Sequence, residues 1–237
     1  MLEYARVKNH AGMILIGDYR TLRALHELTH KLADSSALLH EPAHGDFLLG
    51  LAYDVRKAFE LQREIIDPPP HYDEVGRRYG VKVLWPVFLV QVRLLREAMG
   101  FYPTDVRDQG VAFLLEHVAL IGLADDIGGT DVIASWRRLS CNPASVTDRV
   151  ESRAGVFLHW AKAARRAGLR QLLDSLDPMF EFWYERDPDF WRKGISPEAF
   201  EQVGHLAEFP EPRWSVDRDA HGPKSVGYSG AKGGEAA

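Results

Sequence analysis

The first 16 residues of the chain alternate between apolar and polar positions. Leu2, Tyr4 and Val7 are separated by polar side chains, and an uninterrupted apolar run occupies 13–16 after a stretch rich in turn-forming residues. Alternation with a period of two, bounded by Asn and Gly, is typical of β-strands. The pattern predicts a two-stranded β-ribbon over 2–16, which must pack on other elements because an isolated hairpin is only marginally stable.

After the ribbon, apolar residues recur every three or four positions, which is the period of an amphipathic α-helix. Asp18 is a favourable N-cap for the first helix, and the prolines at 68–70 end the second. The third and fourth helices are apolar nearly all round, so we expect them at the centre of the fold. The predicted helices cover about 19–33, 46–66, 86–99, 105–124, 131–139 and a stretch from 145 to 176 that Gly168 interrupts, with a polar helical turn at 71–79.

These elements predict a mostly α fold, a helical bundle with a small N-terminal two-stranded β-ribbon. We expect a single domain over 1–215, followed by a flexible Gly-rich tail over 216–237 with too few large apolar residues to order itself. The segment 179–191 is dense in aromatic residues. It is expected to pack in the core or, if it is exposed, to form a protein-interaction patch.

Charge and cysteine content narrow the class of protein. The 237 residues carry a net charge of −5, which disfavours nucleic acid as a partner because phosphate binding requires clustered cations. No run reaches the ~20 apolar residues that span a bilayer, so no membrane association is expected. Cys141 is the single cysteine, and no apolar run near the start resembles a signal peptide. These features predict a cytoplasmic protein without disulfides.

One motif indicates possible metal chemistry. His26-Glu27-Leu28-Thr29-His30 matches H-E-x-x-H, in which two histidines one helical turn apart bind Zn²⁺ and the glutamate acts as general base. Helical geometry weakens this interpretation, because His26 lies about 100° and His30 about 140° from the centre of the leucine stripe. Both histidines are therefore expected at the boundary or the surface of the helix, and no third ligand has a diagnostic spacing.

A second match follows at His40-Glu41-Pro42-Ala43-His44. Pro42 is incompatible with a continuous helix across all five residues, so His40 and His44 are not expected to share a helical face. Two interpretations stay open for the four histidines. They are solvated or capping side chains, or they form a metal site that need not be catalytic.

A second candidate site lies in the charge-dense stretch 53–64. Its charges are spaced for ion pairs within one helix, such as Arg56 with Glu60 at i,i+4, and such a face is usually a solvated surface. The alternative is that Arg56 and Arg63 bind a partner or an anion, since guanidinium groups suit bidentate recognition. The candidate contacts to a partner or an anion are Asp54, Arg56, Arg63 and Glu64.

Several segments together resemble an uncharacterised bacterial protein family. They are the run 13–19, the helix that begins with Leu22, the stretches 53–59 and 62–64, and Leu84-Trp85-Pro86. The resemblance covers roughly the first 120 residues. It implies a bacterial cytosolic protein with a short N-terminal hairpin and a helical body, and it carries over no catalytic residue.

The sequence favours a non-enzymatic interaction or regulatory protein, of the accessory, immunity or defence type. A protein partner or self-association is expected, and no cofactor is required. The alternative is a zinc-dependent hydrolase or peptidase, in which His26 and His30 hold the metal and Glu27 is the general base. These two hypotheses differ in the metal content that they predict for the purified protein.

Overall fold

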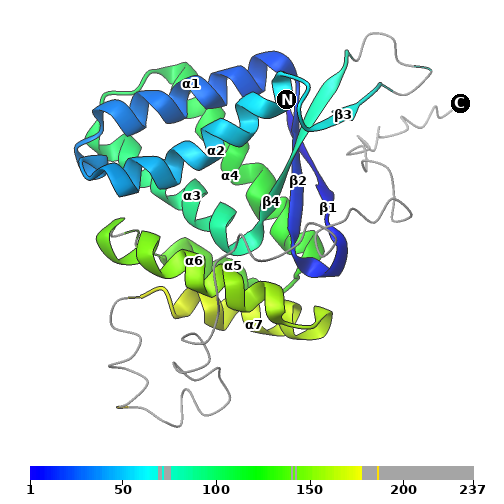
Figure 1. The fold of residues 1–237 in the computed structure, drawn as a ribbon, viewed down its shortest axis with the longest axis vertical. Coiled ribbons are helices and arrows are strands. Elements are labelled where there is room, and N and C mark those ends of the chain that lie inside the picture. Colours follow the sequence, from blue (N-terminus) through cyan, green and yellow to red (C-terminus); the bar gives the residue numbers. More distant parts are fainter. Residues whose placement is uncertain (69–70, 72–75, 140, 142, 178–185, 187–237) are drawn as a thin grey trace, which may run out of the picture.

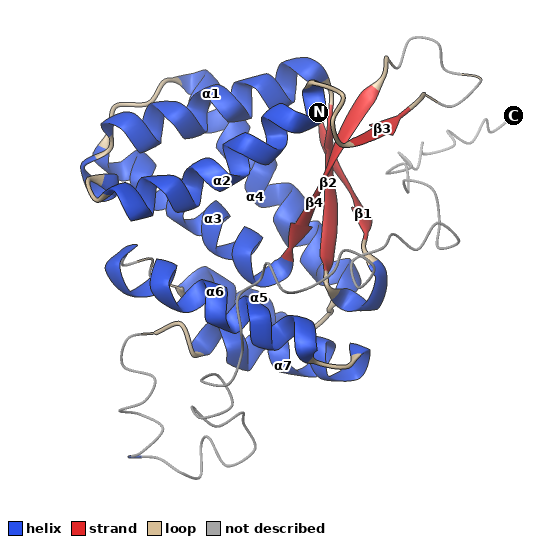
Figure 2. Ribbon diagram, viewed as in Figure 1, coloured by secondary structure: helices blue, strands red, loops and turns tan. Residues whose placement is uncertain are grey.

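The computed structural model consists of a small antiparallel sheet and a larger helical body (Figure 1). It describes residues 1–68, 71, 76–139, 141, 143–177 and 186. The sheet lies to one side of the helices, and the chain order runs from two strands through two helices to two further strands (Figure 2). The expected tail over 216–237 and the aromatic-rich segment 179–191 lie outside the described residues, apart from Arg186.

The sheet has four strands in the spatial order β1-β2-β4-β3, and all neighbouring strands are antiparallel. Its central strand β2 is buried along its whole length. β1 and β4 flank it, and β3 pairs only with β4. The strands are β1 (Leu2–Arg6), β2 (Gly12–Gly17), β3 (Glu64–Ile66) and β4 (Arg78–Leu84).

Seven α-helices are present in the described part of the chain, and they make the fold mostly α as predicted. Helices α1 and α2 pack against each other as a hairpin, α3 packs between this hairpin and α6, and α4 contacts α1, α3 and β1 (Figure 1). The helices are α1 (Tyr19–Ser35), α2 (Pro42–Phe59), α3 (Trp85–Ala98), α4 (Val106–Asp126), α5 (Thr130–Arg138), α6 (Pro143–His159) and α7 (Lys162–Asp174).

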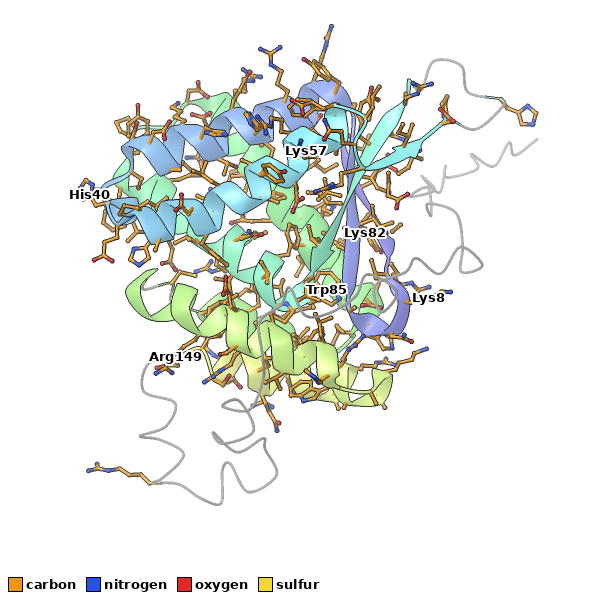
Figure 3. All side chains as sticks on the ribbon, in the orientation of Figure 1. Lys8, His40, Lys57, Lys82, Trp85 and Arg149 are labelled. Atoms are coloured by element: carbon orange, nitrogen blue, oxygen red, sulfur yellow. The ribbon has the colours of Figure 1, made fainter. Side chains whose placement is uncertain are left out.

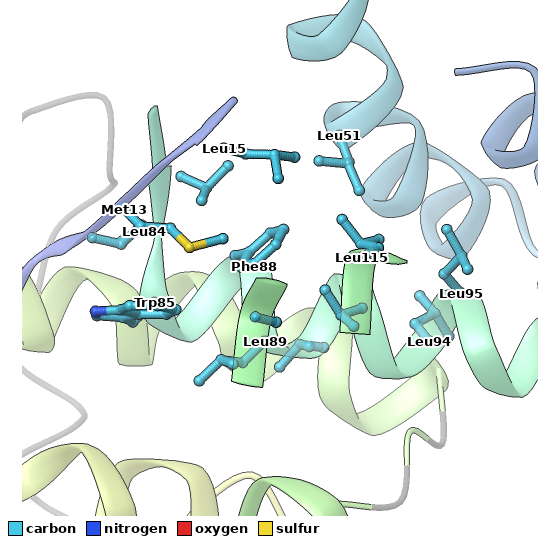
Figure 4. Packing of buried hydrophobic residues seen from close by; sticks show 14 of the residues in the cluster. Met13, Leu15, Leu51, Leu84, Trp85, Phe88, Leu89, Leu94, Leu95 and Leu115 are labelled. Atoms are coloured by element: carbon cyan, nitrogen blue, oxygen red, sulfur yellow. The ribbon is translucent and has the colours of Figure 1, made fainter. Parts of the chain in front are cut away.

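The core forms where β2 and β4 meet α3 and α4. Met13 and Leu15 from β2 lie against Phe88 of α3 and Leu115 of α4, and all four are fully buried (Figure 4). Nearly the whole of α3 is buried, which confirms that this apolar helix is central. Burial of these side chains is the main force that fixes the helices against the sheet.

The prediction of a two-stranded ribbon was wrong in the number of strands. Residues 78–84 form β4, although the sequence indicated a polar helical turn up to 79. Tyr79, Val81 and Val83 alternate with Gly80 and Lys82, and this period of two is the strand signal that the helical assignment overlooked. β4 pairs with β2 across more than 60 residues of sequence, so local pattern alone does not place it.

The second and last helices also differ from their predicted bounds. α2 ends at Phe59 rather than near 66, because Leu61 adopts a left-handed backbone conformation with φ of 65° and the chain then enters β3. α7 continues through Gly168, where a break was expected. A Cβ at Gly168 would lie 2.6 Å from the ring of Trp160, so this glycine permits close packing and does not end the helix.

None of the helices in the described ranges has the length and apolar character required to cross a membrane.

Candidate functional site

Helix α1 places the first histidine pair on its outer boundary. Asp18 begins the helix by accepting a hydrogen bond from the backbone N–H of Thr21 at 2.9 Å. About two and three turns after Asp18, the rings of His26 and His30 lie with their centroids 4.4 Å apart. Both side chains are half-buried, which is the boundary position that the helical geometry predicted.

Glu27 points into a network of surface charges. Its carboxylate accepts a hydrogen bond from Nε of Arg23 at 2.9 Å and forms an ion pair with Arg107 at 3.4 Å. The side chain of Glu27 is exposed, and Arg107 reaches it from α4. The residue proposed as a general base under the zinc hypothesis is therefore held by two guanidinium groups at the surface.

The second histidine pair is divided by the start of a helix. α2 begins at Pro42, so His40 precedes the helix and is exposed, whereas His44 lies within it and is buried. Figure 3 shows His40 at the far end of the α1–α2 hairpin. Within the described ranges, no three or more His, Cys, Asp or Glu side chains come close enough to hold a metal ion. The four histidines therefore do not converge on one point.

The charged residues predicted as partner contacts form ion pairs within the chain. Nη2 of Arg63 lies 2.8 Å from Oδ1 of Asp54, and Glu64 lies 3.3 Å from Nζ of Lys82. Arg56 and Glu60 form the expected i,i+4 pair at 3.8 Å. These pairs are 28–44% exposed on each side chain, so each contributes little to stability.

The structure joins these two candidate regions through a row of aromatic rings. The ring of Phe59 at the end of α2 contacts Tyr19 edge-on at 5.5 Å and His26 at 5.9 Å. His26 in turn lies beside His30. The packing of α1 against α2 thus brings residues 40 positions apart in sequence into one continuous aromatic surface.

Tyr53 of α2 is linked to this row through Arg56, which faces the Tyr53 ring and also lowers the pKa of His26. The guanidinium of Arg56 lies 5.6 Å from the centroid of the Tyr53 ring, and the ammonium of Lys57 lies 5.4 Å from it. Tyr53 is 52% exposed and Tyr19 is 45% exposed. We call this surface the aromatic face and define it by Tyr19, His26, His30, Tyr53, Arg56 and Phe59.

The electrostatics of the aromatic face keep one of its histidines neutral. Desolvation lowers the pKa of His26 from its ordinary value of 6.5, and the neighbouring His30 and Arg56 lower it further. The carboxylates of Glu27 and Glu60 act in the opposite direction but do not compensate. His26 therefore contributes an uncharged ring, which is less costly to bury than an imidazolium.

The sequence pointed to His26, His30 and Arg56 as candidate residues but did not predict that they share a surface. Tyr19 and Phe59 were not among the candidates, and Phe59 is half-buried at the boundary of its helix. The available signal was the short connection between two amphipathic helices, which favours an antiparallel hairpin. That inference would have brought the end of α2 beside the beginning of α1.

Comparison with known proteins gives a family without an assigned activity. No curated protein and no solved structure matches the chain. The family model that matches is described as a domain of unknown function, DUF6904, and it covers residues 2–185. This confirms the predicted resemblance to an uncharacterised family and extends it beyond the first 120 residues. Because the match spans most of the sequence, the chain belongs to the DUF6904 family.

Proposed function

We propose that the chain is a non-enzymatic interaction protein that binds a protein partner through its aromatic face. The observation that carries the proposal is the unbroken row of contacts from Tyr19 through Phe59 and His26 to His30, with Tyr53 and Arg56 beside it, on the outside of the α1–α2 hairpin. Elsewhere in the described residues, most large apolar side chains are buried in the core.

The composition of the aromatic face supports this function. Tyr and Arg are enriched among the residues that dominate binding energy at protein interfaces, because they combine large contact area with polar groups. Tyr53 and Tyr19 expose about half of their surface, and Leu61, which is 52% exposed, follows closely after α2. A partner would bury these side chains without any rearrangement of the helices that present them.

The rim of the aromatic face also resembles the edge of an interface. Paired charges surround the rings: Arg23 with Glu27, Arg56 with Glu60, and Arg63 with Asp54. A polar rim around an aromatic centre is the usual anatomy of a protein interface. Asp54 and Arg63, two of the residues predicted as partner contacts, would then fix the orientation of the partner more than they would add to affinity.

Purified protein and three matched variants test this proposal. Tyr53→Ala and Arg56→Ala remove the exposed part of the aromatic face. Phe113→Ala is the control, since Phe113 is 61% exposed and also lies against a guanidinium, that of Arg96, at 4.4 Å. Light scattering of the pure chain first shows whether a second copy is the partner. If the chain is monomeric, tagged protein is recovered from its native host and the bound proteins are compared.

We expect Phe113→Ala to keep the partner, or the dimer, and Tyr53→Ala to lose it. For an anchor residue of this kind, the substitution should weaken binding by about 2 kcal/mol. If the chain is monomeric and no host protein is recovered with it, the proposal is contradicted. A partner that binds equally well to Tyr53→Ala would contradict the assignment to this face.

The zinc hydrolase is the second candidate, and one observation favours it: the rings of His26 and His30 are adjacent, with centroids 4.4 Å apart. A third ligand would have to come from a bound partner or from outside the described residues. Stoichiometric zinc in the wild-type chain that is lost in the His26→Ala, His30→Ala double variant would support this candidate. Metal-free wild-type protein would exclude it.

A further inference from the structure

A second group of polar side chains lies away from the aromatic face, where η1 (Lys8–His10) meets the last residues of α4 and the first turns of α7. It borders an open hollow of about 670 Å³, a volume in the range of small-molecule sites. The residues that define this hollow are His10, Ile127, Gly128, Gly129, Lys162 and Arg166. Neither the predicted sites nor the proposed function uses it.

His10 is held in one orientation by a buried carboxylate. Asp126, the last residue of α4, has a side chain that is 3% exposed, and its Oδ1 lies 2.8 Å from Nδ1 of His10. When the carboxylate is ionised, Nδ1 carries the hydrogen, so Nε2 is the ring nitrogen that remains for the hollow. Nε2 then accepts a hydrogen bond when His10 is neutral and donates one when it is protonated.

The backbone that carries His10 is strained and firmly held. Asn9 and His10 both adopt left-handed conformations, with φ of 60° and 55°, which for non-glycine residues costs about 1–3 kcal/mol each. The buried guanidinium of Arg165 donates to the carbonyl of Asn9 at 3.2 Å and also to carbonyls of Phe157 and Leu158. These hydrogen bonds from Arg165 fix the turn that places His10 beside the hollow.

Two cations complete the wall opposite His10. Lys162 and Arg166 lie one turn apart on α7, and both are exposed. Nε of Arg166 donates to the carbonyl of Ile127 at 2.9 Å, which holds the guanidinium beside the loop between α4 and α5. Neither cation forms an ion pair with a carboxylate of the described residues, so their charges are available to a ligand.

The loop between α4 and α5 brings its backbone close to the hollow. Gly128 and Gly129 have φ of 73° and 85°, a conformation that glycine adopts without strain. Gly129 is the N-cap of α5 and provides no side-chain cap, and the first N–H groups of a helix have no acceptor within the helix. Ala163 and Ala167 add an apolar wall on the α7 side.

We propose that this hollow binds a small organic phosphate. A phosphate oxygen suits the backbone N–H groups and the cations of Lys162 and Arg166, which pair with no carboxylate in the described part of the chain. When His10 is protonated, its Nε2 donates a hydrogen bond to a phosphate oxygen, and the alanines with Ile127 provide room for an organic group. Ile127, Ala163 and Ala167 give the hollow an apolar part that inorganic phosphate would not contact, which favours a phosphate monoester with a carbon skeleton.

Calorimetry with phenyl phosphate on the full chain tests the proposal, with inorganic phosphate and benzoate for comparison. We expect saturable binding of phenyl phosphate that is tighter than that of either other anion. Shifts of the backbone amide signals of Gly128 and Gly129 in NMR spectra would place the ligand in the hollow.

Three variants locate the interaction. Lys162→Gln should weaken binding about tenfold, as expected for the loss of one charge-assisted contact. His10→Asn should weaken it as well, and Asn tolerates a left-handed backbone. Arg137→Gln is the control, because Arg137 is exposed on α5 and lines a different hollow.

Three results would overturn the proposal. Phenyl phosphate does not bind at millimolar concentration, benzoate binds with equal strength, or Lys162→Gln and Arg137→Gln bind phenyl phosphate with equal affinity. The comparison of Lys162→Gln with Arg137→Gln does not depend on His10→Asn remaining folded. Binding here and protein binding at the aromatic face are separate measurements, so either proposal can fail alone.

Discussion

Trp85 donates its indole N–H to Oδ2 of Asp126 at 2.7 Å, which joins the first residue of α3 to the last residue of α4 inside the core. The indole is fully buried, and its nitrogen-bearing edge points away from the aliphatic side chains around it (Figure 4). A buried N–H requires an acceptor. Since the other oxygen of Asp126 contacts His10, one carboxylate connects the core to the turn that carries this histidine.

The first prediction concerns this carboxylate. Asp126→Ala leaves the Trp85 N–H without its acceptor and removes the partner of His10, so the free energy of unfolding should fall by about 1–3 kcal/mol. Urea denaturation measures the loss. Asp125→Ala is the control, because Asp125 is 31% exposed and its ion pair with Arg6 is long, at 3.6 Å. Equal losses for the two variants would show that the buried contact is not stabilising.

The second prediction concerns the titration of His26. Its pKa is lowered by desolvation and then by His30 and Arg56, so His30→Gln and Arg56→Gln should each raise it. Because an unfolded histidine binds a proton near pH 6.5 while folded His26 binds it at lower pH, acidification below about 6.5 favours the unfolded state. The favourable contribution of neutral His26 is therefore present above this pH and decreases as the pH falls.

NMR titration of the imidazole protons of wild-type protein and both variants measures these values. A His26 pKa that is unchanged in both variants would contradict the electrostatic coupling across the aromatic face.

The third prediction concerns Asp18, whose pKa is about 2. Burial raises this pKa, but hydrogen bonds from the N-terminal ammonium and from the N–H and hydroxyl of Thr21 lower it by more. The stabilisation by the charged carboxylate is present above the ordinary value of 3.8 and is lost as the pH falls towards 2. Asp18→Asn keeps an N-cap side chain without the charge.

The wild-type chain should therefore lose more stability than Asp18→Asn between pH 4 and 2, as measured by urea midpoints at each pH. Parallel losses in the two proteins would show that ionisation of Asp18 does not contribute.

The fourth prediction concerns Cys141. Burial raises the pKa of its thiol to about 12, and the carboxylate of Glu97 adds to this effect. Since the thiolate is the reactive form, the folded protein should react with iodoacetamide far more slowly at pH 8 than the protein unfolded in urea. Mass spectrometry follows the modification. Similar rates in the two states would contradict the buried position of this thiol.

The sequence predicted what depends on local pattern. The leucine spacing of α1 predicted its bounds and the boundary position of His26 and His30, and Pro42 predicted the separation of His40 from His44. The all-round apolar character of α3 and α4 predicted their central position. Each of these conclusions follows from the helical period or from the backbone restriction of proline.

Features that depend on contacts between distant residues were not predicted. β4 pairs with β2, and Asp126 contacts His10 although 116 positions separate them. The predicted end of this helix near 124 lies close to the observed end at Asp126, but nothing local distinguishes the buried carboxylate of Asp126 from the exposed one of Asp125. The aromatic face was not predicted for the same reason, because Tyr19 and Phe59 come into contact only when α1 and α2 form their hairpin.

The central claim is that the aromatic face contacts another protein, and photo-crosslinking in the native host tests it most directly. A photoreactive phenylalanine analogue replaces Tyr53 in one strain and Phe113 in another, since both side chains are more than half exposed. We predict a discrete cross-linked species from position 53 and none of comparable yield from position 113. No cross-link at 53, or the same species from both positions, would contradict the claim.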